Sequence, residues 1–202
     1  MNLILCGLPL SGKTTIGRAL AASIGGAFLD TDEQIEKAYV AATGDALSCR
    51  QIFMTEGEAS FREWEKRQIA SLTEVEDSII AVGGGALLDE ANALLLRAAG
   101  LLIYLRSPWT TLWSRGGQRR DLPAYLDPQE PERSFYAMAA RRAPIYEKSA
   151  HLTLDVDCAQ NTIQALRRLW QVIHSEPFLR SPPGENLMEK QSVPLLTDAL
   201  PV

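Results

Sequence analysis

The chain has 202 residues with 25 acidic and 20 basic side chains, a length that fits one α/β domain plus a short extension. Its net charge of −5 argues against a protein that binds nucleic acid through bulk charge, and its three widely spaced cysteines form neither a metal site nor a disulfide framework. No apolar run approaches the roughly 18 residues of a membrane span, and the apolar start is too short for a signal peptide, so we expect a cytoplasmic enzyme that contacts no membrane.

The first predicted elements are a strand, a glycine-rich loop and a helix. Residues 2–6 are apolar and predict a buried strand, and residues 13–24 predict a helix. The loop between them, from Gly7 to Thr14, fits the phosphate-loop pattern G-x-x-x-x-G-K-[ST] in its required context. Such a loop directs backbone N–H groups at phosphates beside a helix N-terminus. We therefore expect a nucleoside triphosphate to contact the following residues: Leu10, Ser11, Gly12, Lys13, Thr14 and Thr15.

Two aspartates follow the second predicted strand, residues 27–30. Asp30 and Asp32 leave this strand at its carboxyl end, and Asp32 is expected to be the N-cap of a helix that reaches about residue 42. One carboxylate could order Mg²⁺ through water. The other could accept a proton from a substrate hydroxyl or hold that hydroxyl in line.

A possible anion clamp lies on the second of two helices predicted over residues 47–55 and 57–73. Arg62 and Glu65 are three positions apart and share one face of that helix. A guanidinium fixed by a neighbouring carboxylate suits an anionic substrate.

Glycines end the next buried strand, predicted over residues 78–82. Gly83, Gly84 and Gly85 leave backbone without side chains, which allows a ligand to approach closely. A helix over residues 89–98 follows, with Gly100 as its expected C-cap, and then a strand over residues 101–105.

The region at about residues 115–131 predicts a mobile lid. It follows a helix that starts at residue 108, and it carries Arg115, Arg119 and Arg120 before several prolines. Such a lid could close over a triphosphate and bring an arginine to the transferred phosphoryl group. A helix over residues 132–147, which offers Arg142 as a second fixed cation, a strand over residues 151–156 and a helix over residues 161–174 follow.

Alternating strands and helices predict a parallel sheet covered on both faces, which binds its ligands at the carboxyl ends of its strands. The glycine loop, the two aspartates and the triple-glycine turn should therefore meet at one edge. We assign residues 1–174 to this domain, with residues of about 32–65 as a substrate-binding region, and interpret the proline-rich residues 175–202 as a mobile tail or linker.

Taken together, these motifs resemble the shikimate kinase family from about Asn2 to Trp170. The resemblance rests on the segments GLPLSGKTTIGRALA, FLDTD, IFMTEGEASFREWE, GGGA, IYL and RRAPIYE. It implies a P-loop fold of the nucleoside-monophosphate-kinase type, a three-layer α/β/α sandwich with a five-stranded parallel sheet. The implied reaction transfers the γ-phosphate of ATP to the 3-hydroxyl of shikimate, on the route to chorismate and the aromatic amino acids.

The resemblance also implies a role for each motif residue, in a monomer that uses ATP, shikimate and Mg²⁺ and no nucleic acid. Thr14 and Asp30 place the metal, and Lys13, Asp32 and Arg120 are catalytic, with Arg120 contacting the phosphates. The substrate-binding set comprises the following residues: Asp32, Arg62, Gly83, Gly84, Gly85 and Arg142.

The chain departs from the family pattern in three places. Leu10 stands where glycine is usual, residues 38–49 are about six longer, and Asp121 stands beside Arg120 in the lid. These departures keep two alternatives open: a P-loop kinase of another small hydroxy acid or nucleotide, such as gluconate, and a catalytically weak homologue that binds ligands.

Overall fold

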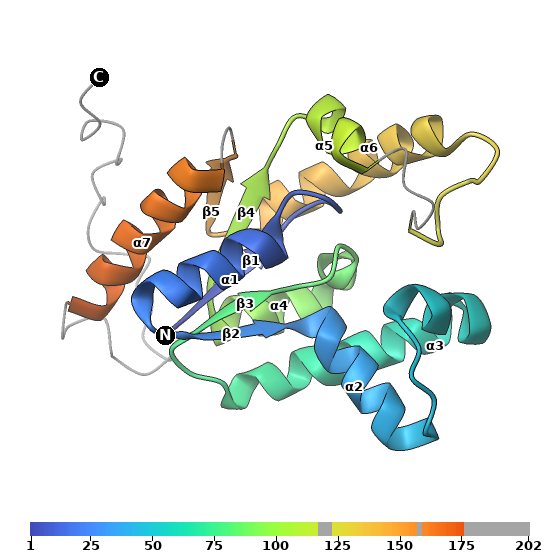
Figure 1. The fold of residues 1–202 in the computed structure, drawn as a ribbon, viewed down its shortest axis with the longest axis horizontal. Helices are drawn as coiled ribbons and strands as arrows, with labels where there is room; N and C mark the ends of the chain where they lie inside the picture. The colour runs from blue at the N-terminus through green and yellow to red at the C-terminus, as the bar shows by residue number, and fades with distance from the viewer. Residues whose placement is uncertain (117–122, 157–158, 176–202) are drawn as a thin grey trace.

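The fold is a three-layer α/β/α sandwich (Figure 1), seen in a computed structural model that describes residues 1–116, 123–156 and 159–175. Five parallel strands form the middle layer in the order β2-β3-β1-β4-β5. Their bounds are Asn2–Cys6 (β1), Ala27–Asp30 (β2), Ser78–Ala81 (β3), Gly100–Arg106 (β4) and Leu152–Asp155 (β5). The predicted fold class is confirmed.

Strand β1 lies at the centre of the sheet and is buried along its whole length. Its side chains alternate between the two faces, so Leu3 and Leu5 enter one hydrophobic cluster while Ile4 and Cys6 enter the other. A parallel strand covered on both faces needs apolar residues at every position. This requirement explains why the chain opens on a continuous apolar run.

Helices cover both faces of this sheet. Helices α1 (Lys13–Ile24) and α7 (Ala159–Ser175) pack together on one face. The other face is covered by α4 (Glu90–Ala99), α5 (Trp109–Gly116), α6 (Pro131–Ser149) and the end of α3 (Cys49–Ser71), with the short 3₁₀ turns η1 (Leu72–Glu74) and η2 (Ala86–Leu88). Within the described ranges, no helix is long and apolar enough to cross a membrane.

Helix α2 (Thr31–Thr43) and α3 up to Phe61 form a small unit beside the sheet (Figure 1). Its own apolar cluster contains Ile35, Tyr39, Ile52 and Phe61. The two helices predicted over residues 47–55 and 57–73 are present as the two halves of α3, separated by a kink at Gly57, where φ is 83° and ψ is 170° and the backbone is not helical. This backbone conformation is essentially restricted to glycine.

One expected helix cap was wrong. Helix α2 begins at Thr31, and its N-cap is Asp30 rather than Asp32: Asp30 Oδ1 accepts the Asp32 N–H at 3.0 Å. Gly100 is the C-cap of α4, as expected, but its φ of 168° is extended, and it is also the first residue of β4. A Cβ at Gly100 would lie 2.5 Å from the Asn2 carbonyl oxygen, so close strand pairing explains this glycine.

Asn2 ties three segments together at the amino end of the sheet. Its side-chain amide donates to the carbonyls of Val75 at 2.7 Å and Ala99 at 2.9 Å, and its side-chain oxygen accepts the Ser78 N–H at 3.0 Å. The side chain is buried, so these backbone groups have little access to water.

Candidate active site

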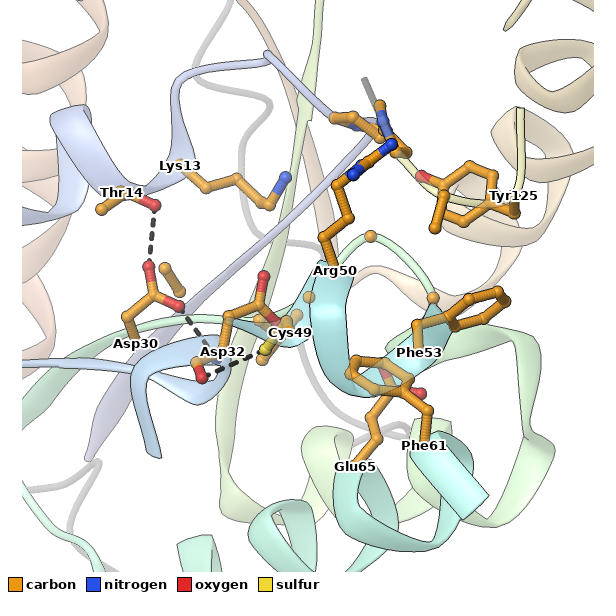
Figure 2. Close-up of a pocket in the computed structure, with 18 of the residues that line it drawn as sticks. Lys13, Thr14, Asp30, Asp32, Cys49, Arg50, Phe53, Phe61, Glu65 and Tyr125 are labelled. Atoms are coloured by element: carbon orange, nitrogen blue, oxygen red, sulfur yellow. Dashed lines mark hydrogen bonds between the residues drawn. The ribbon is translucent and has the colours of Figure 1, made fainter. Parts of the chain in front are cut away.

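A pocket of about 320 Å³ opens at the carboxyl ends of the strands, where the motifs were expected to meet (Figure 2). It is lined by residues of the phosphate loop, β2, α2, α3, the end of β3 with the turn after it, and the described part of the expected lid: Pro9, Leu10, Lys13, Thr14, Asp30, Asp32, Cys49, Arg50, Phe53, Phe61, Arg62, Glu65, Ala81, Val82, Gly83, Gly84, Gly85, Pro123, Ala124 and Tyr125. The convergence of distant motifs on one cavity is confirmed.

The phosphate loop positions Lys13 at the start of α1. Gly12 precedes the helix with a φ of 87°, and the Lys13 ammonium donates to the carbonyls of Gly7 and Leu8, each at 3.0 Å. Burial lowers the pKa of Lys13, although the nearby Asp32 carboxylate acts in the opposite direction. This ammonium is held at the pocket wall, where it could contact a terminal phosphate.

Leu10 adopts a left-handed conformation with a φ of 68°, which few residues other than glycine adopt. Its side chain packs on Gly116, where an added Cβ would lie 2.5 Å from a Leu10 methyl group. The structure thus shows how this loop accommodates a leucine at a position that favours glycine.

Thr14 and Asp30 present oxygen atoms at the base of the pocket. The Thr14 hydroxyl donates to Asp30 Oδ2 at 2.7 Å. Hydroxyl and carboxylate oxygens fit a hard cation such as Mg²⁺, which commonly keeps water and substrate phosphates as its other ligands. Among the described residues there is no cluster of three or more His, Cys, Asp or Glu side chains that could hold a metal by itself. The donor set therefore fits an ion that arrives with the nucleotide.

Asp32 faces the pocket directly after the α2 cap. Burial raises its pKa to about 7, and the negative charge of Asp30 adds to the effect, while Lys13 opposes it. Gly83 makes room for this carboxylate, because a Cβ there would lie 2.6 Å from Asp32 Oδ1. A carboxyl group with such a pKa can exchange a proton near neutral pH.

Arg62 is held by carboxylates on its own helix. It donates to Glu65 at 2.9 Å and to Glu58 at 3.2 Å, and the Glu65 side chain is only 2% exposed. Gly85 provides space for this arginine, because a Cβ at that position would overlap the guanidinium. The predicted clamp geometry of Arg62 and Glu65 on one helix face is present in the structure.

Arg142 lies behind the glycine turn and does not itself line the pocket. It donates to the Gly84 carbonyl at 2.9 Å and to the Tyr125 hydroxyl at 3.3 Å, and it stacks over the Tyr125 ring at 4.4 Å. Its buried Nε has no hydrogen-bond partner among the described residues. Tyr146 also donates to the Gly84 carbonyl, at 2.5 Å, which fixes the turn.

Not every predicted site residue lines the cavity. Ser11, Gly12 and Thr15 belong to the phosphate loop and the first turn of α1 but stand outside the lining set. Arg120 lies outside the described residues, together with Arg119 and Asp121.

Sequence reasoning missed several lining residues. Phe53, Phe61 and Tyr125 form an aromatic wall, with ring centroids 5.8 Å apart for the two phenylalanines and 6.3 Å for Phe53 and Tyr125. Both phenylalanines lie in the segment IFMTEGEASFREWE, which carries part of the family resemblance, so the sequence could have indicated them as pocket residues. Cys49 and Arg50 also line the pocket, on the first turn of α3, and no motif marked them.

A family model described as shikimate kinase matches residues 9–173. A shikimate kinase of Burkholderia pseudomallei (strain 1710b) is 39% identical over 155 residues, which cover 77% of this chain and 80% of that protein. A shikimate kinase of Thiobacillus denitrificans is 40% identical over 168 residues, covering 83% of this chain and 87% of that protein.

A solved structure of the same family also matches this chain. The shikimate kinase from Acinetobacter baumannii in complex with shikimate superposes with a TM-score of 0.74 at 32% identity, covering 86% of this chain and 93% of that one. A gluconokinase from Sinorhizobium meliloti 1021 reaches a TM-score of 0.50 at 15% identity, a likeness that shows a shared fold alone.

Proposed function

Because the chain belongs to the shikimate kinase family, we propose that it transfers the γ-phosphate of ATP to the 3-hydroxyl of shikimate. The observation that carries this proposal is the pairing of two arginines with one aspartate around a glycine turn. Arg62 lies against Gly85, Arg142 donates to the Gly84 carbonyl, and Asp32 lies in the same pocket as the phosphate loop. This arrangement suits an acceptor that carries one carboxylate and several hydroxyls.

The two arginines would orient the acceptor through its carboxylate. Each guanidinium is already fixed, Arg62 by Glu65 and Arg142 by Gly84 and Tyr125, so little freedom is lost when the substrate binds. Two cations on one carboxylate also fix the direction of the ring. Binding energy is thereby used to place the reacting hydroxyl.

Asp32 would hold the reacting hydroxyl and take its proton. As the hydroxyl oxygen bonds to the γ-phosphorus, the bond from that phosphorus to the bridging oxygen breaks, and ADP leaves with the electron pair. The proton passes to the Asp32 carboxylate, whose raised pKa suits this transfer.

Lys13 would contact the terminal phosphates, with loop residues from Leu10 to Thr15 around the nucleotide and Arg120 as the lid contact. Thr14 and Asp30 would hold Mg²⁺, directly or through water, as supported by their 2.7 Å contact and their oxygen donors. When bound, the ion supplies positive charge that offsets the charge of the phosphates.

Turnover with a panel of acceptors tests the function. Release of ADP should be measured with Mg-ATP and shikimate, gluconate or a nucleoside monophosphate. We expect turnover with shikimate alone, reduced about 10²- to 10⁴-fold in Asp32→Asn. Turnover only with another acceptor would contradict the proposal, and so would binding of shikimate without turnover.

We further propose that residues 1–174 form the complete kinase domain and that it works in the cytoplasm as a monomer, without nucleic acid or membrane. The net charge of −5 and the continuity of the family match over residues 9–173 support this view. Deletion of residues 176–202 should then leave kcat within about twofold of the full chain. A large loss of turnover would show that the tail contributes to the enzyme.

A further inference from the structure

Arg50 is a pocket residue to which the motif analysis assigned no role. It lies on the first turn of α3 and lines the same cavity as Lys13, Thr14 and Asp32. Figure 2 shows its side chain extending into the pocket from the side opposite Lys13, so the two cationic ends face a common space. Tyr125 lies on the far side of Arg50 in the same view.

The backbone that carries Arg50 is anchored on both sides. Ser48 caps α3: its hydroxyl accepts the Gln51 N–H, and the Gln51 side chain accepts the Ser48 N–H at 2.9 Å. Cys49 donates its N–H to Glu36 at 2.8 Å and its thiol to the Asp32 carbonyl at 3.3 Å. The start of α3 is thus hydrogen-bonded to the residue that faces the reacting hydroxyl, which fixes the distance between Arg50 and Asp32 at the backbone level.

Two other arginines near the proposed acceptor site, Arg62 and Arg142, contact the glycine turn. Arg62 is held against Gly85 by two carboxylates, and Arg142 lies behind Gly84. Both arginines therefore lie at the glycine turn, where the acceptor carboxylate is proposed to bind. Arg50 extends instead toward the space in front of Lys13, where the donor and the acceptor must meet.

We propose that Arg50 is a further catalytic residue, which donates charge-assisted hydrogen bonds to the phosphoryl group during its transfer. This inference rests on the proposed kinase function. The transferred group carries negative charge on its outer oxygens throughout the reaction, and a planar guanidinium can contact two of them at once. Arg50 does not take part in the proton transfer to Asp32, so its contribution is the stabilisation of charge.

Steady-state kinetics of two variants test the role of Arg50. Arg50→Gln removes the charge and leaves a shorter polar side chain, and Arg50→Lys keeps the charge without the planar fork. We expect kcat to fall about 10- to 100-fold in Arg50→Gln, with a smaller loss in Arg50→Lys and little change in the KM for shikimate. Arg168→Gln, an exposed arginine on α7, is the matched control and should retain the kcat of the unmodified chain.

Binding measurements distinguish a contact of Arg50 with the phosphoryl group from a contact with the acceptor carboxylate. Calorimetry should compare shikimate with shikimate 3-phosphate on the unmodified chain and on Arg50→Gln. We expect the variant to lose affinity for the phosphorylated compound by about tenfold and to keep its affinity for shikimate.

Three outcomes would overturn the inference. An unchanged kcat in Arg50→Gln would exclude a catalytic role, and an equal loss of affinity for both compounds would place Arg50 on the carboxylate. If the unmodified chain does not turn over shikimate, the proposed function fails first. Because Arg50 is exposed, circular dichroism should show the same thermal midpoint for both variants and the unmodified chain.

Discussion

Arg62 contacts two carboxylates that differ sharply in exposure. The Glu65 side chain is 2% exposed, whereas the Glu58 side chain is 64% exposed, although both pair with the same guanidinium. A buried charged partner fixes geometry, while an exposed pair at helical spacing contributes little. The orientation of Arg62 should therefore depend on Glu65.

We predict that Glu65→Gln raises the KM for shikimate about tenfold with little effect on the KM for ATP. The reason is that Arg62 loses its buried counter-charge and no longer points firmly at the glycine turn. Steady-state kinetics with each substrate varied will measure the effect. Glu58→Gln is the control, and it should change the KM for shikimate by less than about twofold. Equal effects of the two variants would contradict this assignment.

Asp32 links the chemistry of the site to the stability of the fold. Its pKa is about 7 in the folded protein against an ordinary value of 3.8, so the folded state binds more protons than the unfolded state between these two values. The free energy of unfolding must therefore fall as the pH rises through this window. The loss is complete above the folded pKa, where the carboxylate is charged in a partly buried site.

We predict that Asp32→Asn raises the free energy of unfolding at pH 8 by about 1 to 2 kcal/mol and leaves it nearly unchanged at pH 4. The gain falls below the full effect of the pKa shift, because Asp32 is only partly buried and the surrounding solvent screens its charge. Urea unfolding without nucleotide or Mg²⁺ at both pH values will measure it. A variant less stable than the unmodified chain at pH 8 would refute the argument.

Single residues show what the sequence could and could not predict about the site. Lys13, Asp32 and Arg62 were predictable because each follows a strand end or shares a helix face with a partner. Arg50 and Tyr125 were not, because their place in the pocket depends on how the α2–α3 unit and the segment after residue 122 pack against the sheet. Such packing follows from long-range contacts that no local pattern encodes.

The kink in helix α3 lies at a single glycine, Gly57. Gly57 separates the half that carries Arg50 and Phe53 from the half that carries Phe61 and Arg62, and all four side chains line the pocket. A Cβ at Gly57 would meet no atom within 4 Å, so any cost of a side chain there comes from the backbone conformation alone.

We predict that Gly57→Ala costs about 1 to 3 kcal/mol of stability and also raises the KM for shikimate, because relief of the strain realigns the two halves of α3. Gly44→Ala is the matched control: Gly44 also has a positive φ, of 84°, and open space around it, but it ends α2 away from the pocket lining. Denaturation and kinetics of both variants will measure the two effects. An increased KM in Gly44→Ala as well would show that general destabilisation is responsible.

Element boundaries were harder to predict than element types. Each described strand and helix was expected near its observed place, since apolar runs and helical spacing are strong local signals. The cap of α2 was wrong because Asp30 and Asp32 are equally good capping residues by composition. Only the strand pairing of β2 and β3, which extends to Asp30, decides where α2 begins.

The whole sheet depends on Asn2 at its amino end. This buried side chain makes three hydrogen bonds to backbone groups at or just before the starts of β3 and β4, the two neighbours of β1. Removing it would leave two carbonyls and one N–H without partners in a buried position. Such losses are among the few that destabilise a protein strongly.

We predict that Asn2→Ala lowers the free energy of unfolding by about 2 to 4 kcal/mol while the KM for shikimate stays the same, because the pocket lies at the opposite end of the sheet. Chemical denaturation and kinetics will measure these quantities. Asn2→Asp is a second test of the hydrogen bonds. Aspartate is nearly the same size as asparagine but cannot donate to the two carbonyls, so this variant should be at least as unstable as Asn2→Ala. A stable Asn2→Asp variant would show that packing, rather than hydrogen bonding, is responsible.

The contact of Leu10 with Gly116 makes these two positions interdependent in evolution. A side chain at position 116 would displace the leucine, while the leucine occupies a backbone conformation better suited to glycine. A lineage with a small residue at position 10 could accept a larger residue at 116 without any shift, whereas a lineage with Leu10 would have to move the leucine methyl groups. The residues at positions 10 and 116, one in the phosphate loop and one at the end of α5, should therefore vary together.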